Sequence, residues 1–217
     1  MIDDHLVATL TASRQAYEAA HRAMLQSIVE TALSVHEAAA CSVLRLDEAS
    51  GEFVFEAVAG AGEGELNGRR FRADRGVAGW SLAARQPVTI GDSAKESAFA
   101  RDIAESTGYV PRAVIAAPLV RGDAPLGVLE VLDGASDRTA TAALALATVF
   151  AAQAAIALDL LRRDLATADA VSAAGRDMRD LMEMSGLIGS MGPGQRAAVL
   201  RLLADVRDLT GERVSRG

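Results

Sequence analysis

Residues 76–92 read GVAGWSLAARQPVTIGD, and they decide how the surrounding chain is interpreted. Two glycines three positions apart, Gly76 and Gly79, open a short apolar helical turn. Pro87 cannot continue a helix, because its ring fixes φ and removes the backbone donor, so the chain must extend there. The VTI run that follows alternates like a short strand, and Gly91 with Asp92 closes it with turn chemistry. The stretch therefore predicts a helix followed by a strand.

Hairpin patterns lie on both sides of this stretch. Residues 41–47 and 52–59 alternate apolar and polar side chains around a turn at 48–51, and residues 113–121 and 126–133 flank a GDAP turn. Between the hairpins, residues 60–70 hold four glycines and predict a loop. A brief strand at Phe71 and Arg72 and a short helix ended by Gly108 complete the middle of the chain.

Long helices are predicted at both ends. Residues 3–40 contain neither proline nor glycine, and one apolar stripe gives way to another that begins at Leu25. At 1.5 Å per residue this helix is longer than one small domain needs, so its first stripe predicts a partner helix. The alternative is that the first dozen residues form a frayed tail. The first stripe includes Leu6, Leu10, Tyr17 and Met24.

A second long helix is predicted from residue 138 to about 174, with its N-cap at Ser136 or Asp137. Ile156 and Leu160 belong to one of its apolar stripes. Glycines from Gly175 onward are expected to break it, and residues 195–209 predict a last amphipathic helix.

Three segments together resemble the GAF domain family. They are the G-x-x-G…P-V-x-I-x-D pattern of residues 76–92, AAPL at 116–119 and GVLEVL at 127–132. The resemblance covers roughly residues 15–165. It implies a sensory module of signalling proteins with an α+β fold, in which a central antiparallel sheet of five to six strands has the terminal helices on one face and the connecting helices and loops on the other.

The resemblance also implies a domain organisation and a mode of assembly. Residues 1–40 form an N-terminal dimerisation helix, residues 41–165 the GAF-like domain, and residues 166–217 a helical extension outside the resemblance. Terminal helices of this family commonly form a dimer bundle, so the expected homodimer interface contains Leu6, Leu10, Tyr17, Met24, Ile156 and Leu160.

The family's usual ligand pocket lies between the sheet and the connecting segments. The residues expected to line it are Trp80, Phe99, Tyr109 and Ile115, with Phe55 and Arg101 as lesser candidates. The alternative is that the aromatic side chains simply fill a core in which aromatics make up only 4% of the sequence. Gly76 and Gly79 lack the lysine of a phosphate-binding loop, so a structural role is expected for them, as for Pro87 and Asp92.

Glu130 interrupts the apolar run GVLEVL, which is expected to be a central strand. A buried carboxylate needs a partner, and Arg45 on the first strand is the candidate. A structural ion pair on the helix-facing side is favoured over a contact with a ligand, and the second possibility stays open.

The residues offer little support for catalysis or metal binding. All three histidines, His5, His21 and His36, precede the first strand, and positions on the helix surface are expected for them. Cys41 is the single cysteine, which excludes an intrachain disulfide and a cysteine-based zinc site. Free methionine sulfoxide reductases, which resemble GAF domains, work through several cysteines. We therefore expect no catalytic residue and no metal site, and the sequence names no cofactor.

The net charge is −7 and the pI about 5.0, which argues against nucleic acid or an anionic membrane as partners. The longest charge-free run, residues 139–158, is alanine-rich and predicts a buried core helix, and no signal peptide precedes it. The sequence thus predicts a cytoplasmic, non-enzymatic sensory or regulatory homodimer that binds a small molecule and acts on a separate output protein. The alternative is a structural dimerisation module with a filled pocket and no ligand.

Overall fold

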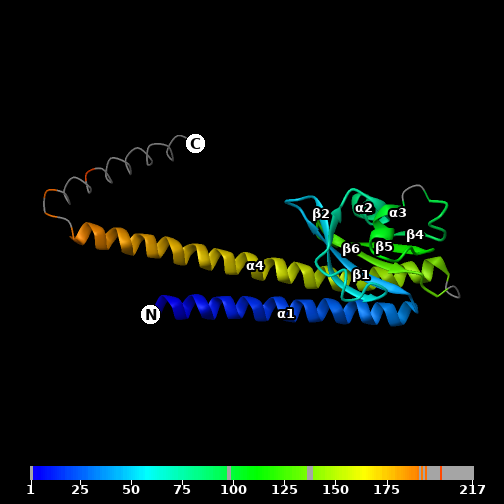
Figure 1. Cartoon of the computed structure of the whole chain (residues 1–217), viewed down its shortest axis with the longest axis horizontal. Coiled ribbons are helices and arrows are strands. Elements are labelled where there is room, and N and C mark those ends of the chain that lie inside the picture. Colours follow the sequence, from blue (N-terminus) through cyan, green and yellow to red (C-terminus); the bar gives the residue numbers. More distant parts are fainter. Residues whose placement is uncertain are drawn as a thin grey trace. The chain divides into compact units, whose positions relative to one another are not determined.

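The structure is a computed structural model that describes residues 2–96, 99–135 and 139–190, with positions 192, 194 and 201 (Figure 1). It divides into two compact units, residues 1–165 and 166–217. The first unit contains an antiparallel sheet of six strands in the order β3-β2-β1-β6-β5-β4. The strands are β1 (Ala40–Asp47), β2 (Glu52–Gly60), β3 (Arg70–Arg72), β4 (Val88–Ile90), β5 (Val114–Arg121) and β6 (Ala124–Leu132).

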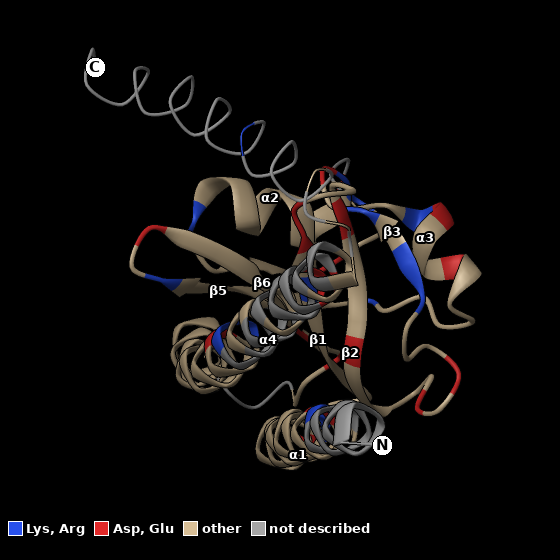
Figure 2. Cartoon of the chain, turned by 90° about the vertical axis from the view of Figure 1, so that its left-hand side faces the viewer, with Lys and Arg blue, Asp and Glu red and all other residues tan. Residues whose placement is uncertain are grey.

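Four helices accompany the sheet: α1 (Ile2–His36), α2 (Gly76–Ala84), α3 (Arg101–Ser106) and α4 (Ala140–Ser190). Figure 2 shows α1 and the part of α4 next to the sheet on one side of it, with α2 on the other. The predicted α+β fold, with terminal helices on one face and connecting segments on the opposite face, is confirmed. The predicted strand at Phe71 and Arg72, the strand VTI and the short helix before Gly108 are all present.

Alternation along each strand divides the core into two layers. Cys41 and Val43 of β1 belong to the cluster that also contains residues of α1 and α4, whereas Leu44 belongs to the cluster under α2. The same alternation holds along β6, where Val131 faces the terminal helices and Val128 faces α2. Each strand of the sheet centre is therefore buried on both faces, which explains its nearly continuous apolar sequence.

The terminal helices bury one stripe each against the sheet. Leu25 and Val29 of α1, and Ala154 and Phe150 of α4, are buried in this layer. His21 and His36 are buried too, so the expected surface position is wrong for both. The physical reason is their spacing, since steps of four and three residues place them on the same helix face as Leu25, Val29 and Ala32.

The helix α4 differs from the prediction. It begins at Ala140, where the Thr139 side chain accepts a hydrogen bond from the backbone N–H of Ala142 at 3.3 Å, and it continues to Ser190. Gly175 does not end it, because an interior glycine costs a helix only about 1 kcal/mol relative to alanine. The N-cap candidates at 136 and 137 lie outside the described residues, and so does the helix predicted at 195–209 apart from position 201.

One segment of α4 has the length and composition of a membrane-spanning helix. It covers Ala140–Arg163, and 44% of its most apolar window is buried within the protein. The buried residues of this segment, among them Phe150 and Ala154, pack in the core layer under the sheet.

Candidate functional site

The helix α2 approaches the preceding loop closely, and Gly79 makes this approach feasible. A Cβ atom at this position would lie 2.6 Å from the carbonyl oxygen of Ala73 and 2.9 Å from the carbonyl carbon of Asp74. Gly76, at the start of the helix, has a φ of +72°. Gly79 therefore lies against the loop at 73–74, where a larger residue would collide with the backbone.

The end of α2 is fixed to strand β5. Arg85 adopts the left-handed conformation and caps the helix, so the chain turns before Pro87 and enters β4. The buried hydroxyl of Ser81 lies 2.9 Å from the carbonyl oxygen of Gln86 and 3.1 Å from that of Ala116. Asp92 then closes the turn after β4, where its carboxylate accepts a hydrogen bond from the backbone of Ala94 and pairs with Lys95.

A cavity of about 80 Å³ lies between the sheet and the α2–α3 segment. Its floor comes from strands β1, β2, β5 and β6, and includes Ser42, Phe55 and Glu130. Val77 and Ala78 of α2 form part of its cover. A space of this volume has room for several water molecules or a small organic molecule. We call it the sheet cavity.

The α3 segment forms one wall of the sheet cavity. Ile103, Ala104 and Thr107 line it from this segment, together with Phe99 before the helix. The Arg75 guanidinium at the start of α2 donates two hydrogen bonds to Asp102, at 2.9 and 3.0 Å, and so connects α2 with α3. This pairing lowers the pKa of the Asp102 carboxyl.

Tyr109 lines the cavity on the same side and is held by Asp133 at the end of β6. The Tyr109 hydroxyl donates to one carboxylate oxygen of Asp133 at 2.5 Å, and the other oxygen accepts from the backbone N–H groups of Arg112 and Ala113 at 2.9 and 2.7 Å. Burial, reinforced by the hydrogen bond to Asp133, raises the pKa of Tyr109 to about 12. The Tyr109 hydroxyl is therefore a fixed hydrogen-bonding group and not an acid at physiological pH.

Glu130 stands on the floor of the sheet cavity, and the predicted ion pair with Arg45 is wrong. In the strand register Glu130 lies opposite Ser42, whereas Arg45 lies opposite Gly127 and donates to Glu56 at 2.5 Å. Glu130 therefore faces the cavity and not the terminal helices. Among the residues that the structure describes, none forms a hydrogen bond or an ion pair with its carboxylate. Burial raises the pKa of Glu130 to about 7.

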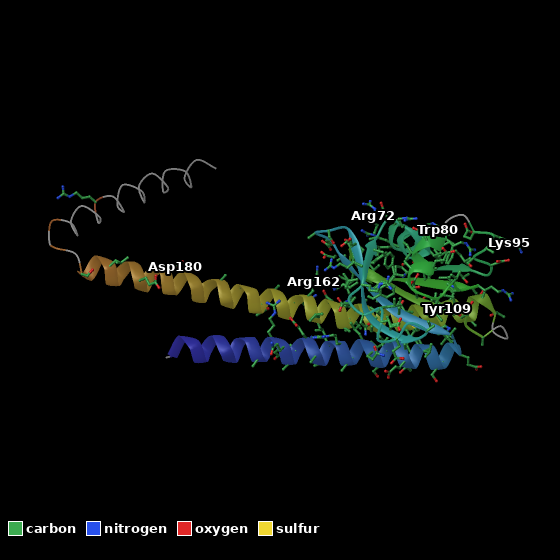
Figure 3. All side chains as sticks on the ribbon, viewed as in Figure 1. Arg72, Trp80, Lys95, Tyr109, Arg162 and Asp180 are labelled. Carbon is green, nitrogen blue, oxygen red and sulfur yellow. The ribbon has the colours of Figure 1, made fainter. Side chains whose placement is uncertain are left out.

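The structure brings together three of the six side chains predicted to line a pocket. Phe55, Phe99 and Tyr109 line the sheet cavity, and Trp80, Ile115 and Arg101 do not. The three exceptions have local causes. Trp80, labelled in Figure 3, is 49% exposed on α2. Ile115 packs on the helix-facing side of the sheet, and Arg101 is exposed at the start of α3.

Sequence reasoning missed Ser42 and Asp133. A polar side chain in the otherwise apolar run ACSVL was a usable signal for Ser42, because alternation places it on the opposite face from Cys41. For Asp133 the only signal was its position directly after a strand, where acidic residues commonly accept backbone hydrogen bonds.

The single cysteine lies on the other side of the sheet from the cavity. Cys41 is fully buried in the layer under the terminal helices, and burial, with the nearby Glu130 charge, raises the pKa of its thiol to about 12. Within residues 2–96, 99–135 and 139–190 no three His, Cys, Asp or Glu side chains are grouped as metal ligands would be.

Both terminal helices expose apolar side chains on the faces turned away from the sheet. Tyr17 of α1 is 58% exposed and Met24 is 39% exposed. On α4, Ile156 and Leu160 are each nearly half exposed. The side chains of Leu6 and Leu10 lie outside the described residues.

A second depression is wider, with a volume of about 1080 Å³, and lies between α1, α4 and the ends of β1 and β2. Charged side chains such as Glu18, Arg22 and Glu56 line it. The Glu56 carboxylate there is already paired with Arg45. In contrast, Glu130 in the sheet cavity has no partner among the described residues, so the sheet cavity is the better candidate for a small ligand.

Comparisons with known proteins agree with this architecture. The GAF domain of a phosphoenolpyruvate-protein phosphotransferase from Coxiella burnetii is 20% identical and superposes with a TM-score of 0.60, over 75% of this chain and 95% of that chain. The second GAF domain of DevS from Mycobacterium smegmatis is 22% identical, with a TM-score of 0.53, over 68% and 99% of the two chains.

An enzyme shares the same fold. The free methionine-R-sulfoxide reductase from Neisseria meningitidis, solved in complex with its substrate, is 19% identical with a TM-score of 0.54, over 72% of this chain and 92% of that chain. No curated protein matches the sequence significantly. The sequence model of the GAF domain matches residues 4–159. This chain therefore belongs to the GAF domain family, a family of signalling and regulatory modules.

Proposed function

We propose that the protein is a non-enzymatic sensory module that binds a small molecule in the sheet cavity and signals as a homodimer through α1 and α4. The observation that carries this proposal is the cavity itself, which lies between the sheet and the α2–α3 segment and combines apolar walls with a few polar groups. Such a lining is typical of small-molecule sites.

The position of the single thiol supports a role without catalysis. The Neisseria meningitidis neighbour is a reductase, but Cys41 here is buried, has a raised pKa and lies on the opposite face of the sheet from the cavity. A nucleophilic cysteine needs an accessible thiolate. A free, buried thiol also fits the reducing cytoplasm, where we place the protein.

The proposed mechanism is a shift between two packings of the terminal helices. Strand β6 connects the two parts, because Glu130 faces the cavity while Leu129 and Val131 contact the layer under α1 and α4. A ligand that moves β6 by a fraction of an ångström changes the surface on which both helices rest. Because α4 continues to Ser190, the change reaches the segment that would meet a separate output protein.

Native mass spectrometry of the full chain, purified gently from its expression host, tests this proposal. We expect a dimer that carries additional small-molecule mass. A dimer of bare chains would favour the interaction module with a filled pocket, and a monomer would contradict signalling through a helical dimer.

The dimer interface can be tested by charge substitution. We expect Met24→Asp or Ile156→Asp to weaken the dimer at least tenfold, because each places a carboxylate in an apolar contact that occurs twice in a symmetric dimer. Val110→Asp is the matched control, since Val110 is an exposed apolar residue outside both terminal helices. Analytical ultracentrifugation measures the dissociation constants. A double variant that stays as dimeric as the wild type would remove this surface from the mechanism.

A further inference from the structure

The sheet cavity has one distinctive polar group. Glu130 lies on its floor, opposite Ser42 of β1 and Ala116 of β5 in the strand register. In the described part of the chain its carboxylate has no hydrogen-bonding or ionic partner. A partly buried carboxylate without a partner loses hydration and regains nothing in return, so it is costly to the fold and favourable for a ligand that can donate to it.

Three other polar groups of the lining already have partners. The Arg75 guanidinium is bound to Asp102, the Tyr109 hydroxyl donates to Asp133, and the Thr107 hydroxyl donates to the carbonyl oxygen of Ala104 at 2.7 Å. An anionic ligand would therefore have to compete with Asp102 for Arg75 while lying near the negative charge of Glu130. A cationic ligand meets an acceptor that no described residue occupies.

We propose that the sheet cavity takes a small ligand with a protonated amine on an apolar body, and that the amine binds to the carboxylate of Glu130. The apolar part would contact Phe55 and Val77, and the Ser42 hydroxyl is placed to accept one further hydrogen from the amine. This inference rests on the proposed function, because it names the class of ligand for the same cavity. The limited volume of about 80 Å³ restricts the ligand to a small alkylamine or a compound of similar size.

Binding of this kind depends on pH in a defined direction. The titratable and charged groups around Glu130 are Arg75 at the start of α2 and Tyr109 before β5 in the cavity lining, with Cys41 of β1 on the opposite face of the sheet. The pKa values of Tyr109 and Cys41 are raised to about 12, so Glu130, with a pKa of about 7, is the one of these groups that titrates near neutrality. An alkylammonium stays protonated to about pH 10. Its affinity should therefore rise about tenfold between pH 6 and pH 8 as Glu130 ionises.

The test compares two probes of the same shape that differ in charge, isobutylammonium and isobutanol, by NMR titration of the full chain at pH 8. We expect the wild type to bind isobutylammonium at least tenfold more tightly than isobutanol, since charge-assisted hydrogen bonds are about twice as strong as neutral ones. Glu130→Gln should lower the affinity for isobutylammonium at least tenfold and leave that for isobutanol within threefold. Glu56→Gln, which removes a carboxylate of β2 outside the sheet cavity, should change neither.

The outcomes separate this inference from the proposed function. If isobutanol binds as tightly as isobutylammonium, or if Glu130→Gln has no effect, the ligand class is wrong while a small-molecule site remains. If isovalerate, an anion of the same shape, binds most tightly, the inferred charge is also wrong. If no probe binds and the purified protein carries no extra mass, both proposals fail. Should Glu130→Gln not fold, the pH series on the wild type decides, and an affinity for isobutylammonium that stays constant from pH 6 to 8 overturns the inference.

Discussion

Replacing Glu130 with glutamine should make the ligand-free protein more stable, and the gain should grow with pH. The pKa of Glu130 is about 7 in the folded state, against an ordinary value of 4.5, because burial disfavours the charged form. The folded protein therefore holds the proton more tightly than the unfolded chain does. The contribution of Glu130 to the stability of the folded protein is therefore most favourable below pH 4.5, and it is lost as the pH rises toward 7.

The magnitude follows from the difference between the two pKa values. About 2.5 pH units at 1.36 kcal/mol each give an upper limit of about 3 kcal/mol, reached above pH 7. Glu130 keeps partial exposure, so solvent screening reduces this value, and we expect about 1–3 kcal/mol. Glutamine keeps the size of the side chain and removes the charge, so the variant should lack this dependence.

Urea unfolding followed by circular dichroism at pH 5, 6, 7 and 8, with the protein concentration fixed, measures the effect. The difference between Glu130→Gln and the wild type should be below about 1 kcal/mol at pH 5 and largest at pH 8. Glu56→Gln is the matched control and should destabilise the protein at pH 8, because it removes the ion pair with Arg45. A difference between Glu130→Gln and wild type that does not change with pH would refute the assignment of Glu130 as a partly buried carboxylate without a described partner.

Two further predictions concern the fixed parts of the fold. Gly79→Ala should destabilise the protein by about 1–3 kcal/mol in urea unfolding, because the new Cβ would overlap the backbone of Ala73. The control Gly91→Ala has open space around it and should cost less than about 0.5 kcal/mol. Equal effects of the two substitutions would contradict the close approach of α2 to the loop. Asp159 on α4 is buried and bonded to Arg163 and Arg162, which lowers its pKa. The stabilising contribution of Asp159 is therefore present above its ordinary pKa of 3.8 and is lost as the pH falls through the lower folded value. The thermal midpoint of Asp159→Asn should fall below that of the wild type at pH 7 and approach it in acid. Parallel curves of midpoint against pH for the two proteins would contradict this.

The fold was largely predictable because its signals are local. The glycines and Pro87 of residues 76–92 indicate a helix followed by a strand, and the two hairpins are indicated by alternating apolar and polar residues on either side of turn residues. The length of α4 was not predictable in this way, because an interior glycine such as Gly175 weakens a helix without ending it.

The candidate site was less predictable, because it depends on which face a residue occupies. Ile115 lies between Val114 and Ala116, which face the opposite side of the sheet, so an error of one position excludes it from the cavity. Trp80 belongs to a helix that is apolar on all sides, so periodicity could not assign its face. Which residue lies opposite Glu130 depends on the register between β1 and β6, whose paired residues are more than 80 positions apart in the sequence, and no local pattern encodes it.

The position of Glu130 on a central strand connects binding with assembly. A carboxylate that binds a cation on one face of β6 regains the free energy that burial had cost, while Leu129 and Val131 on the other face support α1 and α4. For binding to affect the helices, a movement of β6 must be passed to the neighbouring strand β1. At Gly127 of β6 the backbones lie so close that any Cβ would be 1.9 Å from the carbonyl oxygen of Leu44 on β1. The two strands are in close contact at that point, so we expect a small movement of β6 near Glu130 to move β1 as well, and both strands support the terminal helices. Ligand binding and helix packing are therefore expected to be coupled through this strand pair, and a ligand of the inferred class should alter the dimer dissociation constant of the wild type and not that of Glu130→Gln.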